Sequence, residues 1–203
     1  RGIGAVLAVT LVLAACSAPD DPEVGPRPSP SATATTSDPT EPEPDRSGRR
    51  PVLRPGDFDV RQALAVVRHL AADIGPRHGP SPAFQEAARW VDGYFERLGY
   101  DVERRTFEVP AGVSWGIAVA AGSSVNVVAT PAGFDPSRPH LVVGAHLDTV
   151  PQAPGAEDNG SGVGVMLTAA ALAAEARTRL PVVWVAFGAE EPRGDGDDDH
   201  HYG

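Results

Sequence analysis

The stretch that decides the fold runs from LVVGA (141–145) through GVGVMLTAAALAAEAR (162–177) to VVWVAF (182–187). The two outer segments are short, β-branched and almost continuously apolar, which is typical of strands buried on both faces of a sheet. The alanine-rich segment between them predicts a helix, and strand, helix and strand in this order form a parallel crossover unit. A third apolar run, VNVVA (125–129), predicts another buried strand. The sequence therefore indicates an α/β fold with a mostly parallel central sheet flanked by helices.

Two helices and a strand are predicted before this core. Residues 59–74 predict a helix whose apolar positions at helical spacing are Val60, Leu64, Val67 and either Leu70 or Ala71. Glycine and proline at 75–76 end that helix. A second helix begins after Ser81, which can cap it, and its apolar face continues to the glycine at position 99.

The segment after the second helix is less uniform. Residues 101–109 alternate between apolar and polar, which predicts a strand exposed on one side at an antiparallel edge of the sheet. Residues 110–124 are rich in glycine and alanine and predict no definite element.

Ionisable side chains follow each element of the crossover unit. His146 and Asp148 come directly after its first strand, Glu190 and Glu191 follow its second strand, and Asp158 lies in the turn before its helix. Ligands gather at the carboxyl ends of strands in such sheets, and imidazole with carboxylate is a donor set that binds zinc. Each of these residues alone has an ordinary structural explanation, but their occurrence at three neighbouring element ends indicates a divalent metal site.

The motifs HLD, DNGSG and EE, in this order, resemble those of the dinuclear zinc aminopeptidases, a family that includes aminopeptidase Y, bacterial leucyl aminopeptidases and the transferrin-receptor ectodomain. The resemblance covers residues 57–203 and implies hydrolysis of the N-terminal peptide bond by a water activated by two zinc ions. It implies that His146 binds one zinc ion, Asp158 bridges both, Glu191 binds the other and Glu190 is the general base. It further implies that Asp148 orients the His146 ring and that a cis peptide bond follows the bridging aspartate.

Other functions are compatible with parts of this pattern. Zinc deacylases and carboxypeptidases of the same clan share the histidine-x-aspartate strand end and the glutamate pair, but their bridging aspartate lies in a later motif, whereas Asp158 follows His146 by 12 positions (158 − 146). A glutaminyl cyclase, an acyl-transfer relative with one zinc ion, lacks the complete pattern. A non-catalytic surface binding domain on the same fold is a further alternative.

The resemblance also implies that each zinc ion needs one more ligand, an aspartate and a histidine from later segments. The acidic and histidine-rich stretch at 197–201 follows Glu191 too closely for that role and predicts a loop before a further helix. We therefore expect the sequence to be the N-terminal part of a longer enzyme, and this part alone to be inactive.

The first 16 residues resemble a bacterial lipoprotein signal. Arg1 is followed by the uncharged stretch 2–15 and then by Cys16, the only cysteine, which directly follows Leu-Ala-Ala. The resemblance implies that Cys16 is lipidated and becomes the mature N-terminus. Residues 17–55 are rich in proline, serine, threonine and charge, which predicts a disordered linker before a folded domain at 56–203. We therefore expect an extracytoplasmic protein that is lipid-anchored to the bacterial cell membrane.

The charge composition limits the kinds of binding partner that we expect. The formal net charge is −10, and all 17 basic residues are arginines spread along the chain, so no basic patch indicates a nucleic-acid partner. The remaining expected partners are a peptide with a free N-terminus and, through the lipid anchor, a membrane.

Overall fold

The computed structural model describes residues 53–176 and 178–203, all of which lie in the second of the two units into which the chain divides, Pro44–Gly203. The predicted signal segment, Cys16 and nearly all of the predicted linker lie outside the described residues. Within the described part, no helix has both the length and the apolar character needed to cross a membrane.

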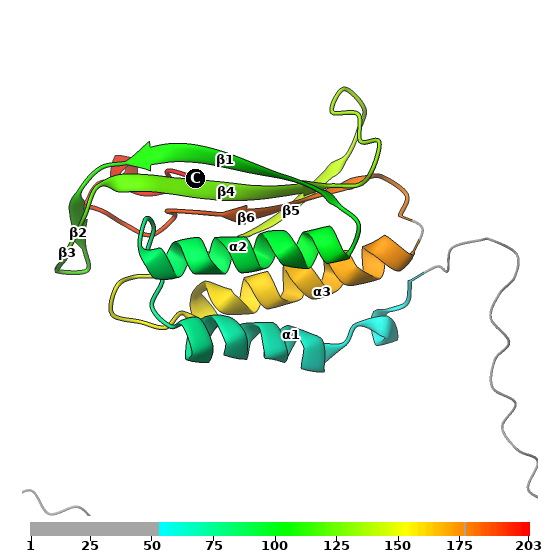
Figure 1. Cartoon of the computed structure of the whole chain (residues 1–203), viewed down its shortest axis with the longest axis horizontal. Helices are drawn as coiled ribbons and strands as arrows, with labels where there is room; N and C mark the ends of the chain where they lie inside the picture. Colours follow the sequence, from blue (N-terminus) through cyan, green and yellow to red (C-terminus); the bar gives the residue numbers. More distant parts are fainter. Residues whose placement is uncertain (1–52, 177) are drawn as a thin grey trace, which may run out of the picture. The chain divides into compact units, whose positions relative to one another are not determined.

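A four-stranded sheet in the order β1–β4–β6–β5 forms the centre of the fold (Figure 1). Strands β5 and β6 are parallel and are joined through helix α3, as the sequence predicted for the crossover unit. Strand β4 pairs antiparallel with both β1 and β6, so the described sheet is mixed. The bounds are β1 Asp101–Val109, β4 Gly122–Thr130, β5 Leu141–His146, β6 Val182–Phe187 and α3 Gly162–Glu175.

Helices α2 and α3 cover one face of this sheet, and α1 packs against α3 on the side away from the strands (Figure 1). Helix α1 (Val60–Arg68) continues into a wider π-helical segment, η2 (His69–Ile74), and α2 spans Pro82–Arg97. Ser81 caps α2 as predicted, because its hydroxyl accepts a hydrogen bond from the Phe84 N–H at 3.1 Å. The main hydrophobic core fills the space between helices and sheet. Its largest buried members include Leu70, Phe84, Phe95, Leu167 and Trp184.

The predicted apolar face of the first helix was wrong in part, because Leu70 is buried as predicted but two other members are exposed. Val60 is 59% exposed and Leu64 48% exposed, whereas Ala63 and Val66 are buried. The reason is the close approach of α1 to α3: a Cβ atom added at Gly164 would lie only 2.7 Å from the Ala63 carbonyl oxygen. This contact requires small residues, so the helix turns its alanine rather than its leucine toward its neighbour.

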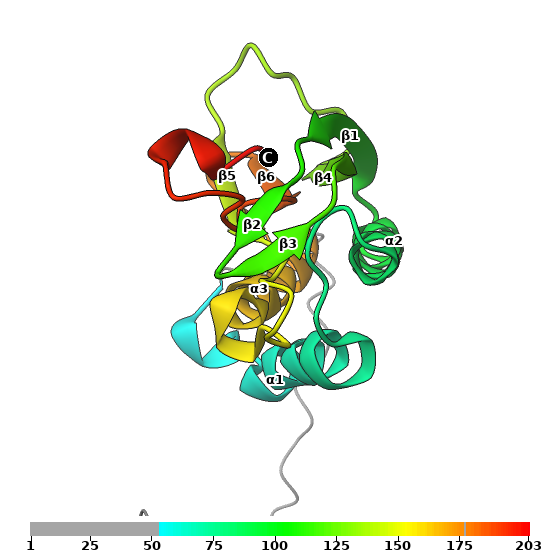
Figure 2. The same ribbon diagram turned by 90° about the vertical axis from the view of Figure 1, so that its left-hand side faces the viewer.

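Strand β5 also differs from its prediction. Its first four residues are exposed, although the sequence predicted burial on both faces, because β5 is the edge strand of the described sheet. The segment that predicted no element forms the hairpin of β2 (Gly112–Ser114) and β3 (Ile117–Val119) and the start of β4. Figure 2 shows this hairpin beside the last residues of the chain, and the Val113 N–H donates to the Arg193 carbonyl at 2.9 Å.

Candidate metal centre

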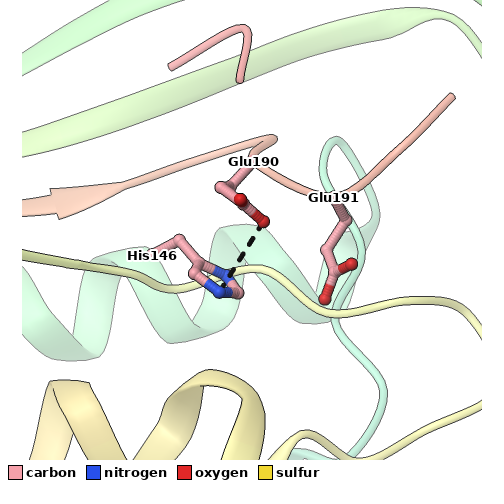
Figure 3. A group of neighbouring side chains, drawn as sticks. All are labelled: His146, Glu190 and Glu191. Atoms are coloured by element: carbon pink, nitrogen blue, oxygen red, sulfur yellow. Dashed lines mark ion pairs between the residues drawn. The ribbon is translucent and has the colours of Figure 1, made fainter. Parts of the chain in front are cut away.

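The parallel pairing of β5 and β6 brings the predicted site residues together. His146, the last residue of β5, is paired in register with Phe187, the last residue of β6. Glu190 and Glu191 follow three and four positions later, so both strands deliver their polar residues to the same edge (Figure 3). One potential ligand atom from each of His146, Glu190 and Glu191 lies within 4.8 Å of the other two. This is the convergence of strand ends that the sequence predicted.

The imidazole of His146 has carboxylates on both sides. Its Nε2 atom lies 2.9 Å from Asp158 Oδ1 and 3.7 Å from Glu190 Oε2. Its Nδ1 atom faces Asp148, at 3.2 Å from the backbone oxygen and 3.6 Å from Oδ1. One ring nitrogen therefore points into the carboxylate cluster while the other is held from behind, an arrangement that orients a histidine for metal binding.

Asp148 has a second connection that the sequence did not indicate. Its side chain is 1% exposed, and its two carboxylate oxygens accept the backbone N–H groups of Glu190 and Glu191, each at 3.1 Å. Asp148 therefore joins the end of β5 to the loop after β6. One carboxylate thus lies against the histidine ring and fixes the backbone that carries the glutamate pair.

Asp158 lies in η3 (Ala156–Ser161), immediately before α3. The peptide bond between Asp158 and Asn159 is cis, which confirms the prediction made from the family resemblance. The Asn159 side-chain oxygen accepts the Gly162 N–H at 3.0 Å, and a Cβ atom at Gly162 would lie 2.2 Å from that oxygen. The turn thus requires glycine at position 162, and it leaves the Asp158 side chain 77% exposed beside His146.

The electrostatics of the centre favour a cation. Burial alone would lower the pKa of His146, but the hydrogen bond to Asp148 and the charges of Asp148, Glu190 and Asp158 raise it to about 9. Burial, together with the charges of Asp148 and Asp158, raises the pKa of Glu191 to about 7. Both raised pKa values have the same cause, the negative charges of carboxylates that lie close together and that His146 neutralises only in part. An imidazole with several carboxylates at these distances fits zinc, and the predicted zinc ligands His146, Asp158 and Glu191 can all contribute to it.

Two buried arginines beside the centre were not found from the sequence. Arg77 is fully buried and contacts both ends of the loop that connects β5 to η3. Arg193 is 6% exposed and donates to the carbonyl oxygens of Gly79, Pro110 and Ala120. The only sequence signal was their position: Arg77 follows a glycine-proline pair, and Arg193 follows Glu191 by two residues.

The acidic and histidine-rich stretch near the end of the chain contacts the centre at one point. Residues Asp197–Asp199 form a short 3₁₀ helix rather than an extended loop. His201 lies beyond it, with Nε2 at 3.3 Å from Glu190 Oε1 and its N–H donating to the Glu190 carbonyl oxygen at 3.1 Å. A pocket of about 360 Å³ lies beside both residues and is also lined by His146 and Phe187.

The sheet, the crossover and the strand ends that converge on His146 give a fold shared with solved zinc exopeptidases. A zinc aminopeptidase from Bacillus subtilis superposes with a TM-score of 0.57 at 18% identity, over 66% of this chain and 62% of that one. A glutaminyl cyclase from Porphyromonas gingivalis superposes with a TM-score of 0.60 at 24% identity, over 71% of this chain and 50% of that one. At such identities these likenesses establish the fold alone.

The sequence comparisons match the part of the chain that carries the site residues. Residues 126–197, the segment that carries the three motifs, match the model of Peptidase family M28. Aminopeptidase YwaD of Bacillus subtilis is 40% identical over 70 residues, which are 34% of this chain and 15% of that enzyme. The chain thus corresponds to only part of the length of these relatives.

Proposed function

We propose that this chain belongs to a zinc-dependent aminopeptidase that hydrolyses the N-terminal peptide bond of peptide substrates. The observation that carries the proposal is the convergence of His146, Glu190 and Glu191 within 4.8 Å, with Asp158 at 2.9 Å from the histidine. The 40% identity to an aminopeptidase over 70 residues supports the choice of reaction.

The positions of these residues assign them different roles in binding zinc and in proton transfer. His146 and Glu191 would hold separate zinc ions and Asp158 would be shared between them, with further ligands contributed from outside this set. When bound, zinc polarises the scissile carbonyl group and lowers the pKa of a water molecule. Glu190 then accepts the proton of the attacking water at a carboxylate oxygen and delivers it to the nitrogen of the leaving amine.

The geometry supports the separate role of Glu190. Its backbone N–H is fixed by Asp148, while its side chain is 33% exposed and faces the 360 Å³ pocket. A general base must reach substrate and water without being fully enclosed, and Glu190 meets that requirement better than the buried Glu191, which is 9% exposed.

The test uses the full-length protein that contains this chain and the variant Glu190→Gln. The unaltered protein should contain zinc and release a chromogenic amine from an amino-acid amide, and a chelator should stop the release. Glu190→Gln should keep its zinc and lose about 10²–10⁴-fold in kcat, the usual contribution of a general base. Glu103→Gln removes the same charge from an exposed position on β1 and should change neither property.

Other substrates distinguish the alternatives. Hydrolysis of N-acyl amino acids but not of amides would establish a deacylase, and cyclisation of an N-terminal glutamine with release of ammonia would establish a cyclase. Bound zinc without any turnover would support a non-catalytic binding domain.

We also propose that the protein is anchored to the outer surface of a bacterial cell membrane through lipidated Cys16. The support is the run of 14 uncharged residues, Gly2–Ala15, that ends in Leu-Ala-Ala directly before this cysteine. Cys16→Ala should move the protein from the membrane fraction to the medium or the periplasm and abolish incorporation of labelled fatty acid. Retention in the membrane with unlabelled protein would exclude this anchor.

A further inference from the structure

Arg77 is a buried cation whose partners are backbone carbonyl groups. It is 0% exposed, and its guanidinium donates to the carbonyl oxygens of Leu147 at 2.7 Å, Pro154 at 2.7 Å and Gly155 at 3.1 Å. It also donates to Leu70 at 3.2 Å and Gly75 at 3.3 Å. Among the residues that the structure describes, no carboxylate forms an ion pair with it.

These carbonyl groups belong to three separate segments. Leu70 and Gly75 lie at the end of the first helical segment, and Leu147 directly follows His146. Pro154 and Gly155 immediately precede the η3 turn, in which Asp158 lies. One planar group therefore fixes the spacing between the strand end that carries the histidine and the turn that carries the shared aspartate.

The backbone around Arg77 strengthens the same connection. The Arg77 N–H donates to Thr149 Oγ1 at 2.9 Å, and that hydroxyl donates to the Val150 carbonyl oxygen at 3.0 Å. Thr149 is itself fully buried and lies against Gly155, where an added Cβ atom would approach the Thr149 methyl group to 2.2 Å. The loop after β5 is thus packed tightly against the residue that binds it.

Packing alone does not explain why position 77 carries an arginine. A buried cation is costly unless its donors are satisfied, and an apolar side chain of similar volume would fill the same space. Arginine offers five donors in a rigid plane, and here they bind the end of η2 and both ends of the loop between β5 and η3. Burial lowers the pKa of Arg77 to about 10, so the group remains charged near neutral pH.

We propose that Arg77 is a positioning residue of the metal centre, which sets the distance between His146 and the Asp158 turn by holding carbonyl groups at both ends of the loop between them. The proposal rests on the proposed function in that the metal is zinc. It predicts that changes at Arg77 weaken zinc binding even though Arg77 is not itself a ligand.

The experiment compares Arg77→Lys and Arg77→Met with a remote core variant, Phe95→Leu, in the full-length protein. Lysine keeps the charge without the planar set of donors, and methionine keeps much of the volume without either. Both variants should bind zinc about 10–100-fold more weakly in a chelator competition, the usual effect of losing a partner that orients the ligands. Phe95 is fully buried in α2. Phe95→Leu should therefore lower the stability of the metal-free protein in urea without changing its zinc affinity.

A second pair of variants keeps the test informative where Arg77 variants do not fold. Thr149→Val preserves shape and removes the acceptor of the Arg77 N–H, so it should produce a smaller loss of zinc affinity in the same direction. Gly155→Ala should lose more zinc affinity than Thr149→Val. Its Cβ atom would lie 2.6 Å from the Asp158 carbonyl oxygen, and the φ of Gly155 is +60°, which strains a residue with a side chain.

The possible outcomes separate this inference from the proposed function. Unchanged zinc affinity in Arg77→Lys and Arg77→Met overturns the inference, and so does an equal loss of zinc affinity in Phe95→Leu. Zinc binding that depends on Arg77 in a protein without peptidase activity supports the inference and rejects the proposed function. A full-length protein that binds no zinc rejects both.

Discussion

The substitution Asp148→Asn tests how the metal centre is assembled. Asp148 is 1% exposed, and its carboxylate accepts the N–H groups of Glu190 and Glu191 at 3.1 Å each while its Oδ1 lies 3.6 Å from His146 Nδ1. Asparagine has nearly the same shape but only one acceptor oxygen on its side chain. Because each oxygen of Asp148 accepts one backbone N–H, the NH₂ group of asparagine must face one of these two donors.

The size of the effect follows from these contacts. A hydrogen bond to a charged group contributes about 1.5–3 kcal/mol, and a buried donor left without a partner costs about 1–3 kcal/mol. Asparagine can keep one of the two bonds in neutral form, so the free energy of unfolding should fall by about 2–3 kcal/mol. Zinc affinity should fall about 10–100-fold, because the same carboxylate orients His146.

Urea unfolding of the metal-free protein measures the first effect, and chelator competition measures the second. Asp101→Asn is the control, because Asp101 is exposed at the start of β1 and its substitution removes the same charge without a buried contact. An Asp148→Asn protein with wild-type unfolding free energy and wild-type zinc affinity would refute the reasoning. A loss of stability alone would show that Asp148 joins the loops but does not orient the histidine.

Two further predictions concern pH and helix packing. Zinc affinity should rise from about pH 6 to about pH 9 and level off above it, because metal binding must displace the protons held by His146, with a pKa of about 9, and Glu191, with a pKa of about 7. The sign for folding is opposite: both raised pKa values stabilise the metal-free protein at low pH, and this stabilisation is lost as the pH rises through about 7 and about 9, so urea unfolding with a chelator should show lower stability at alkaline pH. Affinity independent of pH would exclude His146 as a ligand. Gly164→Ala should lower the free energy of unfolding by about 1–3 kcal/mol, because its Cβ atom would overlap the carbonyl oxygen of α1 at 2.7 Å. Gly93→Ala in α2, where the new Cβ atom meets only Arg97 Nη1 at 3.3 Å, should instead raise it by about 0.5–1 kcal/mol, and equal effects of the two in urea would contradict the packing argument.

The parts of the fold that local sequence determines were predictable. Ser81 and the glycine at 99 mark the ends of α2, and the apolar runs mark β5 and β6, because capping and hydrophobic periodicity act within a few residues. The convergence of His146 with Glu190 and Glu191 followed from the parallel crossover alone. These features need no knowledge of distant contacts.

The remaining features depend on contacts between distant segments. The buried face of α1 is selected by its approach to Gly164, which lies about a hundred positions along the chain, and α1 has apolar residues on more than one face. The exposure of β5 depends on its place at the edge of the described sheet. Arg77 acts on carbonyl groups, which every residue possesses, so no pattern of side chains reveals its partners.

The two buried arginines explain how the centre can keep its negative charge available for a metal. Asp148, Asp158, Glu190 and Glu191 lie close together, and an arginine paired directly with one of them would neutralise a potential ligand or its orienting group. Arg77 and Arg193 instead direct their hydrogen bonds to backbone carbonyl oxygens. The charge of Asp148 still acts through space on both arginines, because it opposes the lowering of their pKa values by burial. The charge of Glu191 acts on Arg77 in the same way. The arginines thus stabilise the loops and moderate the repulsion among the carboxylates without occupying them, which leaves His146, Asp158 and Glu191 free to bind zinc.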